Sequence, residues 1–169
     1  MATAYLGLGA NLGNRRKQLI AAAALLAERA GDIPALSGFY ETAPWGYDSP
    51  HPFLNAALQL ETGLSPAELL AVTQQIEREL GRSSKTGGTA AYRDRPVDID
   101  LLLYDRLVLE QPGLVLPHPL MHKRLFVLQP LAEIAPSLQH PALRQTIAAL
   151  LEQAKKRRHP PGDALPSIQ

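Results

Sequence analysis

The sequence predicts an α+β fold on two observations. Runs with the two-residue period of strands alternate with runs that have the 3.6-residue period of helices. Their order is strand, helix, strand, strand, helix, strand, followed by additions. The 169 residues suit a single domain, which we expect over 1–156, with 157–169 as a flexible C-terminal tail.

The first half of the chain is expected to contain a helix between strands. The side chain of Asn14 is suited to capping that helix, and a stretch with three prolines cannot be regular. The expected elements are a short buried strand over 4–8, a helix from Asn14 to about Ala30 that Gly31–Pro34 ends, and strands over 37–42 and 53–62.

The second half begins with the clearest helix start in the chain, Ser65-Pro66-Ala67-Glu68. Serine caps the helix, proline occupies its first turn, glutamate completes a capping box, and Gly81 ends the helix. The further elements expected are a strand over 97–104, a turn at Asp105-Arg106 into a hairpin strand over 107–109, a short helix over 125–134, and a helix over 143–155.

This order of elements is that of the ferredoxin-like βαββαβ fold. We expect a mostly antiparallel sheet with two helices on one face. The C-terminal hairpin and helices would be additions to this core, with the helices covering the other face in a three-layer α/β/α arrangement.

Asp98 and Asp100 alternate along the strand expected over 97–104, so both carboxylates share one face, with Cα atoms roughly 6.5–7 Å apart. The opposite face is apolar, with Val97, Ile99, Leu101 and Leu103. Neighbouring carboxylates repel each other and are costly to desolvate, and a divalent cation relieves both problems. Oxygen ligands suit Mg²⁺, and Arg95 is suited to holding a phosphate. The pattern predicts a magnesium–nucleotide site.

Plainer interpretations stand beside this one. Asp-x-Asp alone is a weak motif, and its carboxylates can be solvated or paired with Arg93 and Arg95.

The glycines near the N-terminus match no phosphate-binding motif. The spacing of Gly7, Gly9 and Gly13 differs from the dinucleotide fingerprint by one residue, and the segment lacks the Lys-Ser/Thr of a P-loop. We reject both motifs and expect these glycines to let the backbone approach a flat group or a packed neighbour.

An aromatic ring and an amide share one face of the strand over 53–62. Phe53 offers stacking and Asn55 offers paired hydrogen bonds, which an aminopyrimidine-type heterocycle requires. The alternative is that Phe53 is a core residue and that Asn55 hydrogen-bonds to the backbone of a turn.

His118 and His122 are four residues apart, the spacing at which two histidines on a helix can bind zinc, but the prolines that flank His118 argue against a helix there. A neutral His118 that donates to a phosphate is the better hypothesis, with Arg124 as a second donor.

Composition disfavours several other classes of protein. A formal net charge of +1 gives no global attraction to nucleic acid or membranes, and 5% aromatic residues disfavour an RNA-binding sheet. No apolar run approaches the ~20 residues that span a bilayer, and no signal segment is recognisable. With no cysteine, disulfides and thiolate metal sites are excluded. We expect a cytoplasmic monomer without nucleic-acid or membrane partners.

Six groups of segments between about 5 and 136 carry a specific resemblance. They are Tyr5–Gly13, Thr42–Gly46, Phe53–Ala57, Gln74–Glu77 with Gly81-Arg82, Arg95–Leu101, and Pro117-His118 with Arg124–Val127 and Pro130-Leu131. In this order and spacing they resemble the 6-hydroxymethyl-7,8-dihydropterin pyrophosphokinases of folate biosynthesis. The resemblance implies transfer of the terminal pyrophosphoryl group of ATP to the hydroxymethyl group of the pterin, with release of AMP.

The resemblance also implies roles for particular residues. Asp98 and Asp100 would hold two Mg²⁺ ions with ATP, and Arg82 and Arg95 would complete the catalytic set. The implied pterin-binding residues are Thr42, Pro44, Trp45, Phe53, Asn55 and Phe126. The implied ATP-binding residues are Leu70, Gln74, Glu77, Arg82, Lys85, Tyr92, Arg95, Leu101, His118 and Arg124.

The chain departs from the family pattern in the loop over 82–93, which the resemblance implies to be a lid. Tyr92 stands where the family commonly has tryptophan, Ser84 replaces an arginine, and Gly87–Ala91 lengthens the loop. We expect these changes to affect closing and phosphate contacts rather than the reaction. A rival hypothesis is a ferredoxin-like regulatory module without chemistry. It explains the order of elements but not the carboxylate pair beside arginines.

Overall fold

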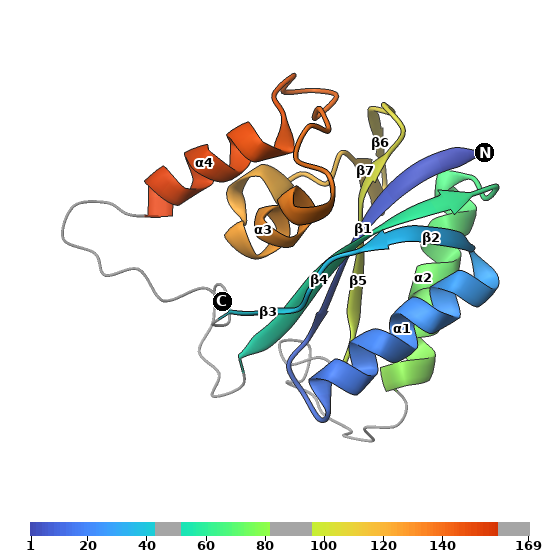
Figure 1. Cartoon of the computed structure of the whole chain (residues 1–169). Coiled ribbons are helices and arrows are strands. Elements are labelled where there is room, and N and C mark those ends of the chain that lie inside the picture. Colours follow the sequence, from blue (N-terminus) through green and yellow to red (C-terminus); the bar gives the residue numbers. More distant parts are fainter. Residues whose placement is uncertain (43–51, 82–95, 159–169) are drawn as a thin grey trace.

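An antiparallel sheet forms the middle layer of the computed structural model, which describes residues 1–42, 52–81 and 96–158 (Figure 1). Its strands lie in the order β2 (Gly31–Leu36), β4 (Phe53–Thr62), β1 (Ala2–Ala10) and β5 (Asp98–Tyr104), and β3 (Tyr40–Thr42) also pairs with β4. This order confirms the ferredoxin-like prediction and places the aspartate strand beside β1.

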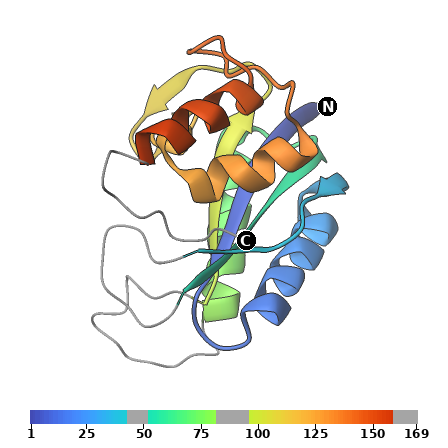
Figure 2. The same cartoon turned by 60° about the vertical axis from the view of Figure 1, so that its left-hand side comes forward.

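Helices cover both faces of this sheet (Figures 1 and 2). One face carries α1 (Arg15–Arg29) and α2 (Pro66–Gly81), and the other carries α3 (Leu125–Ile134) and α4 (Ile147–Arg158). Each face has its own buried apolar cluster, so the predicted three layers are confirmed. Helix α4 continues two residues past the expected domain boundary at 156. No helix in these ranges is long and apolar enough to cross a membrane.

Both predicted helix starts have the expected caps. The Asn14 side chain accepts a hydrogen bond from the Lys17 backbone N–H at 3.1 Å. Ser65 and Glu68 form a reciprocal capping box, in which each side chain accepts from the other's backbone N–H. These local bonds fix where α1 and α2 begin, and α2 then reaches the aspartate strand through Glu77.

The segment Gly31–Pro34 was expected to end the first helix, and α1 does end directly before it, at Arg29 with Ala30 as its cap, but the segment also forms a strand that was not predicted. It belongs to β2, whose pairing with β4 shifts register between Asp32 and Ala35. Pro34 lies inside this irregular stretch, on a strand at the edge of the sheet, where a missing N–H costs little. The predicted strand over 37–42 is correspondingly reduced to the three residues of β3.

We expect Gly31→Ala to lower the free energy of unfolding by about 2–4 kcal/mol, measured by urea denaturation. Gly31 has φ +152°, and an added Cβ would lie 2.0 Å from the carbonyl oxygen of Glu61. Gly63→Ala is the matched control, because a Cβ there meets nothing within 4 Å. Equal stability of the two variants would contradict the close approach of β2 to β4.

Strand β5 departs from strict alternation at Leu102. Tyr5 pairs with Leu103 and Leu6 with Leu101, so Leu102 is an extra residue in a β-bulge. Leu103 was expected to share a face with Leu101, but it packs in the cluster beneath α3 and α4 instead. The bulge leaves Asp98 and Asp100 upstream of it unaffected, and they keep their common face.

The region after β5 also differs from expectation. The hairpin consists of β6 (Leu109–Gln111) and β7 (Leu114–Leu116), rather than a strand over 107–109 turning back on β5. Gly113, at φ +82°, supplies the left-handed turn residue between them. A 3₁₀ turn (Met121–Lys123) precedes α3. Helix α4 begins at Ile147 rather than at the expected 143, directly after Thr146 forms a β-bridge with Gln139, and Leu143 is 40% exposed instead of buried.

Candidate active site

A cavity of about 150 Å³ opens on the face of the sheet that carries Asp98 and Asp100. At about 15 Å³ for each water, this volume holds roughly ten waters, and a small fused heterocycle has about the same number of non-hydrogen atoms. Its lining comes from four strands and from α3 with the residue preceding it: Gly7, Leu8, Gly9, Thr42, Phe53, Asn55, Ala56, Asp98, Asp100, Arg124, Phe126 and Val127. The described residues predicted to bind a pterin therefore lie together, and both aspartates lie with them.

Strands β3 and β4 position the amide and one ring. Asn55 is 4% exposed, and its Nδ2 donates to Thr42 Oγ1 at 2.8 Å. Thr42 and Phe53 are cross-strand partners, so one end of the cavity depends on the register of this short pairing. A Cβ on Gly9 would approach Asn55 Oδ1 to 3.1 Å, so this glycine lets the backbone approach a packed neighbour, which is one of the two expected roles.

The second ring comes from α3. Arg124 is the residue that precedes this helix, and its guanidinium lies 5.6 Å from the centre of the Phe126 ring. Both side chains line the same cavity as Phe53. The arrangement places two aromatic rings, an amide and a cation around one space, which suits an electron-rich heterocycle bearing hydrogen-bonding groups.

A third carboxylate, from helix α2, contacts the backbone of the aspartate strand β5. Glu77 on α2 accepts a hydrogen bond from the Ile99 backbone N–H at 2.7 Å, between Asp98 and Asp100 in the chain. Burial first, and then the negative charges of Asp98 and Asp100, raise the pKa of Glu77 to about 7, against the lowering effect of the Ile99 N–H. Such a concentration of negative charge favours a bound cation.

The donor set fits magnesium. Two aspartates facing one cavity match the usual protein contribution to a Mg²⁺ site, where substrate phosphates and water supply the remaining oxygens. In the described ranges no group of three or more acidic or histidine side chains has the arrangement of a complete metal site, so phosphate oxygens would be needed to complete it.

A second cavity shares Asp100 with the first. Its lining consists of Leu70, Ile99, Asp100, Leu101, Gly113, Leu114, Val115, His118 and Pro119. Three residues predicted to bind ATP therefore meet here, and Asp100 lines both cavities. Gln74, which is exposed, and Glu77 lie on α2 and line neither of these two cavities, so their contact with ATP remains a prediction.

The bulge in β5 positions His118. The backbone N–H of His118 donates to the Leu102 carbonyl at 2.9 Å, and its Nδ1 accepts from the Leu120 N–H at 3.2 Å. Because Nδ1 accepts, the neutral imidazole carries its proton on Nε2. Burial lowers the pKa of His118, and the charge of Arg124 lowers it further, against Asp98. The lowered pKa favours the neutral imidazole, with Nε2 as its donor, and donation from Nε2 to a phosphate stays a prediction.

The remaining predicted site residues lie outside the described residues: Pro44, Trp45, Arg82, Lys85, Tyr92 and Arg95. Sequence reasoning missed the contribution of Gly113–Val115, because only the β6–β7 turn brings that segment to Leu70. The Pro112-Gly113 pair was the available signal. It predicts a turn, but it does not show which distant segment the turn contacts.

Comparison with known proteins identifies close relatives. The family model of 7,8-dihydro-6-hydroxymethylpterin-pyrophosphokinase (HPPK) matches residues 5–136. A 2-amino-4-hydroxy-6-hydroxymethyldihydropteridine pyrophosphokinase of Porphyromonas gingivalis is 52% identical over 142 residues, covering 83% of this chain and 95% of that protein. The enzyme of the same name from Bacillus subtilis is 44% identical over 140 residues, covering 82% and 81%.

Solved structures show the same fold. A crystal structure of Plasmodium falciparum HPPK-DHPS with SDX-DHP has a TM-score of 0.70 and 18% sequence identity. The match covers 94% of this chain but 44% of that longer one, so the chain spans less than half of the solved protein. At this identity the likeness concerns the fold alone.

Proposed function

The chain belongs to the 7,8-dihydro-6-hydroxymethylpterin-pyrophosphokinase family, and from this premise we propose that the two cavities that share Asp100 bind the pterin and ATP. The reaction is pyrophosphoryl transfer to the hydroxymethyl group of 6-hydroxymethyl-7,8-dihydropterin, in folate biosynthesis. The observation that carries the proposed placement of the substrates is that Asp100 lines both cavities.

The pterin occupies the cavity that contains the rings. Phe53 and Phe126 stack on the bicyclic ring, and Asn55 reads its pyrimidine edge. Main-chain groups near Thr42, Pro44 and Trp45 add hydrogen bonds. In this placement the hydroxymethyl group points toward the aspartates, because Asp98 and Asp100 line the same cavity.

ATP occupies the cavity between α2 and β7. Leu70 and Leu101 give it apolar lining, and His118 donates from Nε2 to a phosphate oxygen. Arg124 lies on the pterin side and contacts the transferred group. Further contacts to ATP come from Gln74, Glu77, Arg82, Lys85, Tyr92 and Arg95.

Asp98 and Asp100 would hold two Mg²⁺ ions together with ATP, and bound magnesium would supply charge neutralisation for the phosphates and a lower pKa for the attacking alcohol. The residues of the chain align the reactants. The alcohol oxygen forms a bond to the β-phosphorus of ATP, the bond from that phosphorus to the α–β bridging oxygen breaks, and AMP leaves. The alcohol proton is released to water in the same process, which balances the transfer. Arg82 and Arg95 stabilise the charge that develops on the phosphates.

This activity is assigned to a single domain over 1–156 that works as a cytoplasmic monomer. Its partners are ATP, magnesium and the pterin, without nucleic acid or membranes.

Product analysis tests the proposed reaction. The purified chain, given ATP, Mg²⁺ and 6-hydroxymethyl-7,8-dihydropterin, is expected to form AMP and the pterin diphosphate in equal amounts, measured by ion-exchange chromatography. Omission of Mg²⁺ is expected to abolish both products. Formation of ADP would show transfer of a single phosphoryl group and refute the proposed bond cleavage. Binding of the pterin with no nucleotide consumed would favour the regulatory module.

A further inference from the structure

One guanidinium holds two points of the chain that flank the segment 43–51. Arg15, the first residue of α1, has its Nη1 2.7 Å from Glu41 Oε2, and the same atom donates to the Pro52 carbonyl at 2.9 Å. Glu41 precedes Thr42, and Pro52 precedes Phe53. We propose that Arg15 is a positioning residue that fixes Thr42 and Phe53 for the pterin, an inference that rests on the proposed function.

The pairing beside Arg15 has little support of its own. Strand β3 has three residues, and it pairs with β4 through Tyr40–Asn55, Glu41–Leu54 and Thr42–Phe53. Thr42–Phe53 is the last of these pairs, and the end of so short a ladder opens easily. The Arg15 contacts fall one residue away from this pair on each strand, which is where an added constraint most reduces opening.

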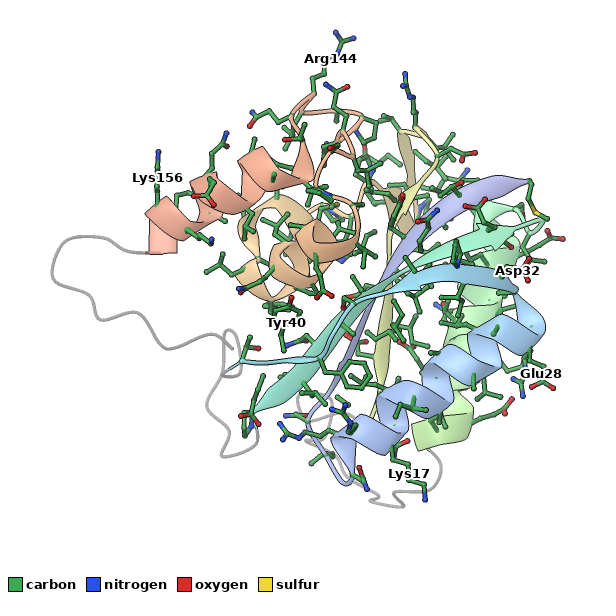
Figure 3. All side chains as sticks on the ribbon, viewed as in Figure 1. Lys17, Glu28, Asp32, Tyr40, Arg144 and Lys156 are labelled. Carbon is green, nitrogen blue, oxygen red and sulfur yellow. The ribbon has the colours of Figure 1, made fainter. Side chains whose placement is uncertain are left out.

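The start of β3, at Tyr40, is held by helix α3, on the face of the sheet away from α1. Tyr40 donates from its hydroxyl to Glu133 on α3 at 2.6 Å, and the Gly38 N–H donates to the same carboxylate. Figure 3 shows Tyr40 between β3 and α3. This contact secures the start of β3 and leaves its end, at Thr42, to Arg15.

The Arg15 contacts are expected to act locally. The side chains of Arg15 and Glu41 are 29% and 46% exposed, and ion pairs with such access to water contribute little to global stability. Loss of Arg15 should therefore leave the fold intact. Because one nitrogen serves both acceptors, a lysine of different length and shape should replace it only in part.

Two residues of α1 provide matched controls. Arg29 forms an ion pair of the same 2.7 Å length with Glu79 on α2, remote from the cavity lining. Lys17 lies in the same turn as Arg15 and carries the same charge, but Figure 3 shows it extending away from the sheet. Arg29→Ala removes an ion pair that is at least as extensive, since both of its Nη atoms bond to Glu79, and Lys17→Ala removes an equivalent charge.

Amide hydrogen exchange tests the constraint without any substrate. Arg15→Ala is expected to accelerate exchange in 40–42 and 53–55 at least fivefold, whereas the two controls leave these amides within twofold of the parent. Unchanged exchange in Arg15→Ala would overturn the proposal. This measurement decides whether Arg15 holds these strands even if the chain were found not to form AMP, which would refute only the proposed reaction.

Steady-state kinetics then tests the consequence for the pterin. Arg15→Ala is expected to raise the KM for the pterin about five- to tenfold and to leave the KM for ATP within twofold, with Arg15→Lys intermediate. Both controls should retain the parent KM values. A parallel rise in both KM values would indicate general loosening and overturn the proposal, as would a pterin KM within twofold of the parent.

Discussion

Asp98→Asn and Asp100→Asn are each expected to lower kcat by at least roughly 10³-fold while leaving the fold intact, which corresponds to about 4 kcal/mol of lost transition-state stabilisation. Asparagine keeps the shape of the side chain and removes the negative charge that a magnesium ion requires. The loss should be partly reversed at high Mg²⁺, because a weakened site is refilled by mass action. The measurement is kcat as a function of Mg²⁺ concentration.

Stability measurements distinguish this role from a structural one. Burial and the charges of both aspartates raise the pKa of Glu77 to about 7, so these carboxylates repel one another in the folded protein. Removing one charge should leave the free energy of unfolding unchanged or slightly increased. If the aspartates instead served mainly to neutralise neighbouring arginines, their replacement would destabilise the protein. Near-parental kcat with lowered stability would therefore refute the metal role.

The strength of the sequence prediction depended on how local each signal was. Alternation along β5 is a property of consecutive residues, so Asp98 and Asp100 were correctly placed on one face. The bulge at Leu102 arises from pairing with β1, which no periodicity within β5 reveals, and Leu103 was misplaced for that reason. Pro34 was assigned to a helix end because only the edge position of β2 makes it acceptable in a strand.

Contacts between distant segments were beyond local reasoning. Glu77 was expected on a face of α2 near the nucleotide, but its bond to the Ile99 N–H depends on how α2 packs on the sheet. Arg15 was not singled out at all, because an arginine at the start of a helix is ordinary. Its significance comes from the layer arrangement, which brings α1 to both strands that flank 43–51.

Asn55→Leu is expected to lower kcat/KM for the pterin by roughly 10²-fold, or about 2.7 kcal/mol, with the KM for ATP nearly unchanged. Leucine has a similar size, so the cavity keeps its shape, but the pyrimidine edge of the pterin loses its hydrogen-bonding partner. A buried polar group left unpaired in the complex carries most of this cost. The measurement is initial rate against pterin concentration at saturating ATP and Mg²⁺.

Two controls separate this loss from simpler effects of the substitution. Gln59→Leu makes the same kind of change on the same face of β4, outside the cavity, and should leave kcat/KM near the parental value. Thr42→Val removes the hydroxyl that accepts from Asn55 Nδ2 and should cost tenfold or less, because the amide itself remains. If Thr42→Val matched Asn55→Leu, the amide would act by holding β3 rather than by reading the pterin, since only the bond between the strands is common to both variants.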